Sequence, residues 1–387
     1  MRLERIPVTL FSDDRALTDS PKRVRVGWVL ILVALIGTLV LSFAPTPYVI
    51  EQPGPVFDTL GEVEVSGKNV SLISIDSETT YPTTGTLSML TVSVLGNRDE
   101  HPSWIDVVSA WADPSRAVVP VDAVYPEGET VEQSNEQSAV DMQNSQKDAV
   151  AAALGNLGYS FTSTLTVAGF SPDSPAEALL RTGDVIVSVN GSRPADVTEL
   201  RALVADNGVD RPAELVILHK GAEQSAEVTP FLPTGTEFGG DPKPVVGISV
   251  RSDYGFPFDV KIQLDNVGGP SAGMMFALGI IDKLTPGSLN GGADVAGTGT
   301  ISSDGTVGPI GGIRQKLYGA QDAGAEHFLA PARNCDEVVG HVPAGLSVYS
   351  VATLDDSLAV LNALESGSKK DLARLPTCTA SSSTAGN

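Results

Sequence analysis

Residues 266–273 read Asn-Val-Gly-Gly-Pro-Ser-Ala-Gly, and they join a strand-like run at residues 258–264 to a helical pattern that ends before Pro286. Ser271 therefore lies at a glycine-rich turn from strand to helix. The free N–H groups at a helix N-terminus, together with the helix dipole, can stabilise a developing oxyanion. The pattern predicts a nucleophilic serine, although a serine that only caps the helix would fit it as well.

A nucleophilic serine needs a base, and residues 309–316 read Pro-Ile-Gly-Gly-Ile-Arg-Gln-Lys. A helix is expected from Ile313, with Ile313, Leu317 and Ala320 as its apolar stripe and Lys316 on or beside that stripe. Burial lowers the pKa of a lysine, so that a neutral amine can accept the serine proton near pH 7. The alternative is a lysine whose stem lies on the apolar face while its ammonium group reaches water.

These two segments resemble the nucleophile and base motifs of Lon proteases. The first is Gly269–Pro270–Ser271 with the following Ala-Gly, and Lys316 ends the second. The resemblance implies that Ser271 is the nucleophile and Lys316 the general base, with Gly269 and Pro270 as supporting residues. Thr298, in a Thr-Gly-Thr segment, matches the Lon element that orients the lysine. The reaction implied is peptide-bond hydrolysis through an acyl-enzyme, without cofactor or metal.

The chain departs from many Lon proteases at two places. Where those proteases carry Lys-Asp, this sequence has Val267 and Gly268, so any positioning role of the acidic residue is in doubt. The sequence also contains no Gly-x-x-x-x-Gly-Lys-Ser/Thr loop for nucleotide phosphates. We therefore expect proteolysis that is independent of ATP.

Residues 158–231 resemble a PDZ domain of the bacterial periplasmic type. The resemblance rests on Ser-Pro-Ala at residues 174–176 and Gly-Asp-Val-Ile at residues 183–186. It implies that extended protein or peptide substrates are captured by adding a strand to the sheet. The peptide-binding residues are predicted to be Gly158, Tyr159 and Phe161.

An uncharged apolar run covers residues 26–44, and Lys22, Arg23 and Arg25 precede it. Its length and the flanking positive charges predict one transmembrane helix with a cytoplasmic N-terminus. We therefore expect a single-pass protein of the cell membrane with an extracytoplasmic catalytic domain. A cleaved signal peptide is the alternative, because small residues and Pro45 follow the run.

The predicted fold class is α+β, with an N-terminal transmembrane helix, a PDZ-like domain and a Lon-type proteolytic domain. From residue 26 onward the chain is similar to the PDZ-containing Lon-like serine proteases of Gram-positive bacteria. The predicted divisions are a cytoplasmic tail (1–25), the transmembrane helix (26–44), a β-rich juxtamembrane region ending in a helix (45–157), the PDZ-like domain (158–231), the proteolytic domain (245–375) and a disordered tail (376–387).

The composition limits the other functions. A formal net charge of −22 argues against nucleic-acid binding. The sequence has no metal-ligand spacing of the Cys-x-x-Cys or His-Glu-x-x-His kind. The two cysteines, Cys335 and Cys378, can form a disulfide or remain as thiols. A homo-oligomer is possible because Lon domains commonly form rings.

Two further functions compete with the protease. Gly-x-Ser-x-Gly is also the nucleophile motif of α/β-hydrolases, in which Asp322 with His327 or His341 would complete a triad. However, too few residues precede Ser271 within its domain for the strands of that fold. The second alternative is a catalytically inactive, membrane-tethered scaffold that binds peptides.

Overall fold

The computed structural model describes residues 21–126, 128, 130–171, 174–233, 243–265 and 267–379, with only the backbone described at residues 21–25 and 43. Residues 1–20 of the predicted N-terminal tail and residues 380–387 of the predicted C-terminal tail lie outside the described residues.

The larger part of the protein is built on a six-stranded mixed sheet in the order β17-β16-β13-β5-β1-β6. Its strands are β1 (Tyr48–Asp58), β5 (Thr86–Leu95), β6 (Ala117–Pro120), β13 (Asp294–Gly297), β16 (His327–Pro331) and β17 (Ser347–Val351). The four strands from β17 to β5 are parallel, whereas β1 is antiparallel to both β5 and β6. Strands from near the start of the chain thus complete a sheet whose other half comes from its last third.

Helices cover both faces of this sheet because its strands are apolar on both sides. Leu329 packs in one hydrophobic cluster with helices α6 (Gly273–Leu284) and α9 (Leu354–Glu365). Its neighbour Phe328 packs in a separate cluster with α7 (Ile313–Asp322). The result is a three-layer α/β/α arrangement in which α6 and α7 lie on opposite faces of the sheet.

The smaller part is a five-stranded antiparallel sheet in the order β10-β9-β8-β7-β11. Its elements are β7 (Thr162–Phe170), β8 (Val185–Val189), β9 (Ala213–His219), β10 (Ala222–Val228), β11 (Ile248–Gly255) and the helix α5 (Val197–Asn207). This sheet and α5 enclose a hydrophobic cluster of their own. The turn after β8 has Asn190 at φ 49° and Gly191 at φ 78°, the left-handed conformations for which Asn-Gly is suited.

Short elements connect these layers. The remaining strands are β2 (Glu62–Val65), β3 (Lys68–Ser71), β4 (Ile73–Ser74), β12 (Lys261–Ile262), β14 (Thr300–Ile301) and β15 (Val307–Gly308). The remaining short helices are α2 (Trp104–Trp111), α3 (Val121–Val124), η2 (Ala332–Asn334), α8 (Cys335–Val338) and α10 (Lys369–Leu372).

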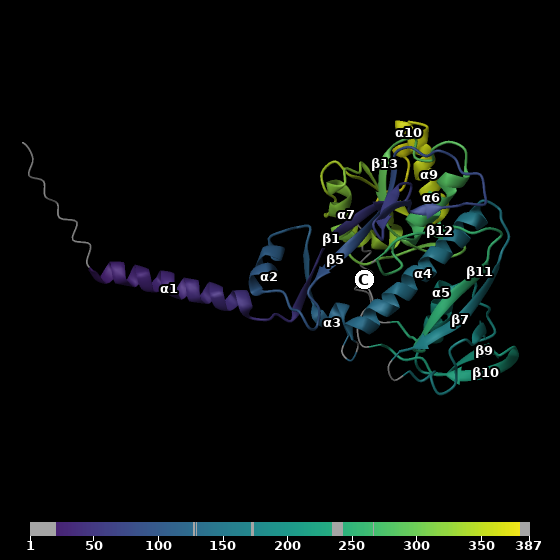
Figure 1. Ribbon diagram of the computed structural model, residues 1–387, viewed down its shortest axis with the longest axis horizontal. Coiled ribbons are helices and arrows are strands. Elements are labelled where there is room, and N and C mark those ends of the chain that lie inside the picture. Colours follow the sequence, from purple (N-terminus) through teal and green to yellow (C-terminus); the bar gives the residue numbers. More distant parts are fainter. Residues whose placement is uncertain are drawn as a thin grey trace, which may run out of the picture.

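The long helix α4 (Val131–Asn156) lies between the two sheets (Figure 1). Thr130 begins it with a capping box, in which its hydroxyl accepts a hydrogen bond from the Gln133 N–H and the Gln133 side chain accepts one from the Thr130 N–H. From the sequence, the Ala- and Leu-rich residues 145–157 predict a helix that starts only at about Ser145, a plausible N-cap. Its earlier start is explained by the capping box, and it places Ser145 in the middle of the helix.

Helix α1 (Pro21–Phe43) extends away from the rest of the protein (Figure 1). Within the described part of the chain, no helix combines the length and the apolar character needed to cross a membrane. This finding corrects the predicted fold class and location: the α+β class is retained, whereas the transmembrane helix at 26–44 and the single-pass membrane location are not.

Cys335 and Cys378 form a disulfide. Nearby, the Ser350 N–H donates to the Pro376 carbonyl, so the described start of the C-terminal tail lies along β17. The bond links residues 43 apart in the sequence, and closing a loop of this size restricts the unfolded chain.

We expect the double substitution Cys335→Ser with Cys378→Ser to destabilise this part of the protein by about 2–4 kcal/mol. The measurement is thermal unfolding of the variant and the wild type, each with and without reductant. Reductant should lower the midpoint of the wild type but not that of the variant. Equal midpoints for all four samples would contradict a stabilising disulfide.

Candidate active site

Ser271 lies in the turn that leads into α6. Gly269 adopts φ +82°, a left-handed conformation that favours glycine, and the chain then turns through Pro270 to the helix. The N-cap of α6 is Ala272, and no side chain caps this helix end. Ser271 is therefore not a capping serine, and its half-buried hydroxyl is available for another contact.

That contact is with Lys316, whose Nζ lies 2.7 Å from the Ser271 Oγ. Lys316 is on the first turn of α7, and only 2% of its surface is exposed. Its ammonium group therefore does not reach water, and the alternative interpretation, which required contact with water, does not hold. Burial lowers its pKa to about 7, because desolvation penalises the charged form.

Thr298 lies between β13 and β14 and is completely buried. Its hydroxyl donates to the Ser271 carbonyl at 2.9 Å and accepts a hydrogen bond from the Lys316 Nζ at 3.0 Å. The Gly299 N–H also donates to the Ser271 carbonyl, at 2.9 Å. Because the one hydroxyl proton of Thr298 is used by this carbonyl, the Thr298 oxygen can only accept from the amine. A neutral Lys316 would thus direct an N–H at Thr298 and its lone pair at Ser271.

Helix α4 supports the nucleophile turn from the other side. The Gly269 N–H donates to the Ser138 carbonyl at 2.9 Å, and the Ser145 hydroxyl donates to the Pro270 carbonyl at 2.8 Å. Ser145 is buried. Neither serine is identifiable from the sequence as a contact of the site, because both are more than 120 residues away in the chain and carry no recognisable motif.

Gly273, the first residue of α6, packs closely against α4 and β14. A Cβ atom at Gly273 would lie 2.7 Å from the Ser145 Oγ and 2.9 Å from a methyl carbon of Ile301. Real Cβ atoms do not approach other atoms so closely, so only glycine lets α6 begin this near to α4 and β14.

The structure brings Ser271, Lys316 and Thr298 together, with Gly269 and Pro270 in the turn, but the predicted peptide-binding residues are engaged elsewhere. The N–H groups of Gly158 and Tyr159 donate to carbonyls of the last turns of α4, at Gly155 and Leu154. Phe161 packs edge-on against Tyr254. In this state these N–H groups are not directed at a ligand.

The residues of the alternative hydrolase triad are occupied by other partners. The Nδ1 of His327 lies 3.3 Å from the Tyr349 hydroxyl, and the Nδ1 of His341 contacts the Val339 carbonyl at 3.2 Å. Ser271 instead contacts an amine. Among the described residues, no cluster of three His, Cys, Asp or Glu could hold a metal ion.

Comparisons with known families agree with both halves of this architecture. The Lon protease (S16) C-terminal proteolytic domain matches residues 266–364, and the PDZ domain matches residues 140–229. The chain contains a Lon-type proteolytic domain and a PDZ domain. The first match includes Ser271, Thr298 and Lys316; the second includes α4 from residue 140 onward.

Individual relatives match short segments of the chain. The chain is similar to Lon protease 1 of Sorangium cellulosum, with 42% identity over 94 residues, and to Lon protease 2 of Herpetosiphon aurantiacus, with 40% identity over 121 residues. These alignments cover 24% and 29% of this chain but only 11% and 15% of the relatives. The chain thus spans a small part of the length of the curated relatives it matches.

Two of the similar solved structures are PDZ domains. The PDZ domains of the SdrC-like proteins of Listeria monocytogenes and Listeria innocua are each 20% identical, with a TM-score of 0.19. Each match covers 22% of this chain, and 85% and 92% of the respective structures. At this score the likeness carries no further argument.

The pKa of Lys316 leads to a prediction about pH. A base must be neutral to accept a proton, so kcat/KM for a short fluorogenic peptide should rise with pH through an apparent pKa of about 7. Lys316→Arg should be inactive from pH 6 to 9, because a guanidinium group stays protonated throughout this range. A wild-type profile that is flat below pH 9 would contradict a lysine base.

The packing at Gly273 leads to a second prediction. Gly273→Ala should displace the nucleophile turn and lower kcat by about 100-fold, since small misplacements of reacting groups have effects of this size. Gly155→Ala is the matched control, because a Cβ on this glycine of α4 meets nothing within 4 Å. Equal kcat values for the two variants would show that the contact does not position Ser271.

Proposed function

We propose that the protein is an ATP-independent serine endopeptidase that uses Ser271 and Lys316 as a catalytic dyad. The observation that carries this proposal is the 2.7 Å contact between the Ser271 Oγ and a completely desolvated lysine amine. Near neutral pH a large share of such an amine is neutral, and it then accepts the hydroxyl proton. The match to the Lon-type proteolytic domain supports the same reaction class.

In this mechanism the Ser271 Oγ attacks the carbonyl carbon of the scissile bond while its proton passes to the Lys316 Nζ. Backbone N–H groups at the nucleophile turn stabilise the negative oxygen of the tetrahedral intermediate. When the C–N bond breaks, Nζ returns the proton to the leaving amine. Water then hydrolyses the acyl-enzyme, with Nζ again as the base. Thr298 keeps the amine oriented, and Gly269 and Pro270 shape the turn.

For the division of the chain, we propose that the proteolytic unit extends beyond the predicted residues 245–375. Strands β1, β5 and β6, from the predicted region 45–157, belong to the same sheet as β13, β16 and β17. The PDZ unit likewise extends beyond the predicted residues 158–231 to include β11, because β11 pairs with β7 along its full length.

We also propose that the PDZ domain captures extended protein or peptide segments on the outer edge of β11, not at the loop of Gly158, Tyr159 and Phe161. β11 is the last strand of its sheet, and an edge strand offers N–H and C=O groups to an added strand. The N–H groups of Gly158 and Tyr159 already have carbonyl partners in α4. These two bonds close the C-terminal turn of α4, whereas the edge of β11 offers both donors and acceptors to an added strand.

The proposed reaction is tested by digestion of an unfolded, carboxymethylated protein without ATP. Wild type should cleave it, whereas Ser271→Ala and Lys316→Met should lose at least about 10³-fold in rate, the effect expected when a nucleophile or its base is removed. Gly155→Ala serves as the control for the purification. Equal cleavage by all the variants would overturn the dyad. No cleavage by the wild type, together with no labelling of Ser271 by a serine-reactive probe, would favour the peptide-binding scaffold.

A further inference from the structure

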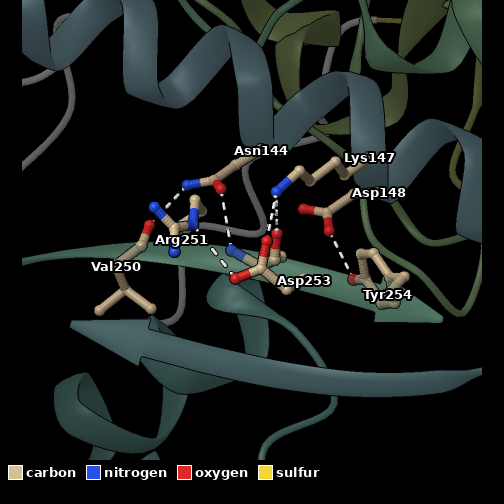
Figure 2. A network of polar contacts seen from close by, with 8 residues as sticks. Asn144, Lys147, Asp148, Val250, Arg251, Asp253 and Tyr254 are labelled. Atoms are coloured by element: carbon tan, nitrogen blue, oxygen red, sulfur yellow. Dashed lines mark hydrogen bonds and ion pairs between the residues drawn. The ribbon is translucent and has the colours of Figure 1, made fainter. Parts of the chain in front are cut away.

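The outer edge of β11 is occupied by α4. Figure 2 shows Asn144 of this helix above the strand, with its side-chain amide directed at the backbone. The Asn144 Nδ2 donates to the Val250 carbonyl at 2.6 Å, and the Ser252 N–H donates to the Asn144 Oδ1 at 2.9 Å. Asn144 is 5% exposed. Both backbone groups therefore have a buried partner on the side away from β7.

These two hydrogen bonds are the ones that an added strand would form. Along an edge strand, every second residue directs its N–H and C=O away from the sheet. The Asn144 carboxamide directs one N–H donor and its C=O acceptor at this edge, as the N–H and C=O of one residue in a paired strand do. Asn144 thus takes the place of one residue of a bound strand.

Neighbouring residues of α4 extend the contact along the PDZ domain. The Gln137 Oε1 accepts from the Ser249 hydroxyl at 2.5 Å, and the Asp148 carboxylate accepts from the Tyr254 hydroxyl at 2.5 Å (Figure 2 for the second pair). Gln137, Asn144 and Asp148 are spaced by seven and then four residues, so their side chains lie on one side of the helix. Lys147 also donates to the Ser252 carbonyl, at 2.7 Å.

Helix α4 also contacts α5, which packs on the same sheet. The Asp141 carboxylate of α4 forms an ion pair with Arg201 of α5 at 3.1 Å. These contacts of α4 with β11 and α5 are polar. Polar contacts can be exchanged for equivalent contacts with a ligand at a small net change in free energy, whereas a tightly packed apolar interface cannot.

We propose that α4 is an internal ligand of the PDZ domain: Asn144 blocks the outer edge of β11, and an extended peptide pairs with this edge only after α4 has moved away. This inference rests on the proposed peptide capture at β11. Because the same helix holds the nucleophile turn through Ser138 and Ser145, displacement of α4 reaches the Ser271 turn as well. The PDZ edge and the active site thereby share one structural element.

The test measures peptide binding by the full chain carrying Ser271→Ala, so that nothing is cleaved. The probe is a fluorescein-labelled ten-residue peptide that ends in Ser-Val-Ser-Val with a free carboxylate, and binding is followed by fluorescence anisotropy. Adding Asn144→Ala should tighten binding about tenfold, because the peptide no longer has to displace two hydrogen bonds. Gln143→Ala is the matched control on the exposed side of the same helix, and it should bind like the parent.

Two further measurements make the result specific. A probe methylated on alternate backbone nitrogens cannot pair as a strand, and it should gain nothing from Asn144→Ala. Hydrogen exchange of the Ser252 amide should accelerate at least tenfold in Asn144→Ala and slow again when the peptide is added. If Asn144→Ala does not fold, Asn144→Asp replaces the donor to Val250 with a carboxylate oxygen that repels this carbonyl, and it should also tighten binding, by at least about threefold.

Equal affinity of the Asn144→Ala and Gln143→Ala proteins, despite faster exchange at Ser252, would overturn the inference. Absence of peptide binding in every variant would overturn it too. Neither outcome affects the proposed dyad, because that is tested separately by ATP-free digestion with Ser271 in place.

Discussion

The Lys316 amine is buried next to two hydroxyl groups, and the rest of the candidate active site depends on this arrangement. A lysine with a carboxylate partner would remain charged, since the negative charge would stabilise the ammonium form. Here the contacts of Nζ are with Ser271 and Thr298, and desolvation alone accounts for its lowered pKa. The apolar residues around α7, such as Ile313 and Leu317, provide the environment of low polarity. The hydrophobic core thus favours the neutral form of the Lys316 amine.

This arrangement brings Ser271 and Lys316 together from different layers. Ser271 precedes α6 on one face of the six-stranded sheet, whereas Lys316 is on α7, which packs on the other face. Thr298, just after the central strand β13, connects the two by accepting from the amine and donating to the Ser271 carbonyl. Because Thr298 follows a strand that is paired on both sides, the position of its hydroxyl is fixed by the sheet.

The PDZ domain is attached to this framework through polar contacts at two places. One is the contact of α4 with β11. At the other, the Asp196 side chain caps α5 by accepting from the Glu199 N–H, and it also accepts from the Ser303 N–H and hydroxyl of the β14–β15 turn. Asp196 is almost completely buried. β11 and α5 therefore each contact a segment close to the candidate active site. β11 contacts α4, which also contacts the nucleophile turn. The cap residue of α5 contacts the β14–β15 turn, which follows Thr298 in the chain.

The sequence alone predicted the residues of the candidate site and the class of the fold. Ser271, Lys316 and Thr298 were predicted because short segments around them resemble motifs of Lon proteases, and such motifs are local in the sequence. The α+β class followed from periodicities that are equally local. The same local pattern also led to an error, since the apolar run at residues 26–44 predicted a transmembrane helix that the described structure does not support.

Only the tertiary structure decided which distant segments meet. Strand β5 pairs with β1 on one side and, on the other, with β13, which lies about 200 residues later in the chain. Ser145 and Asn144 carry no motif, yet one holds the nucleophile turn and the other the edge of β11. Their roles arise from hydrogen bonds between residues more than 100 positions apart. Folding buries the backbone groups of the turn and of β11, and a buried polar group needs a partner within the protein because water is excluded. These contacts therefore cannot be predicted from local sequence patterns.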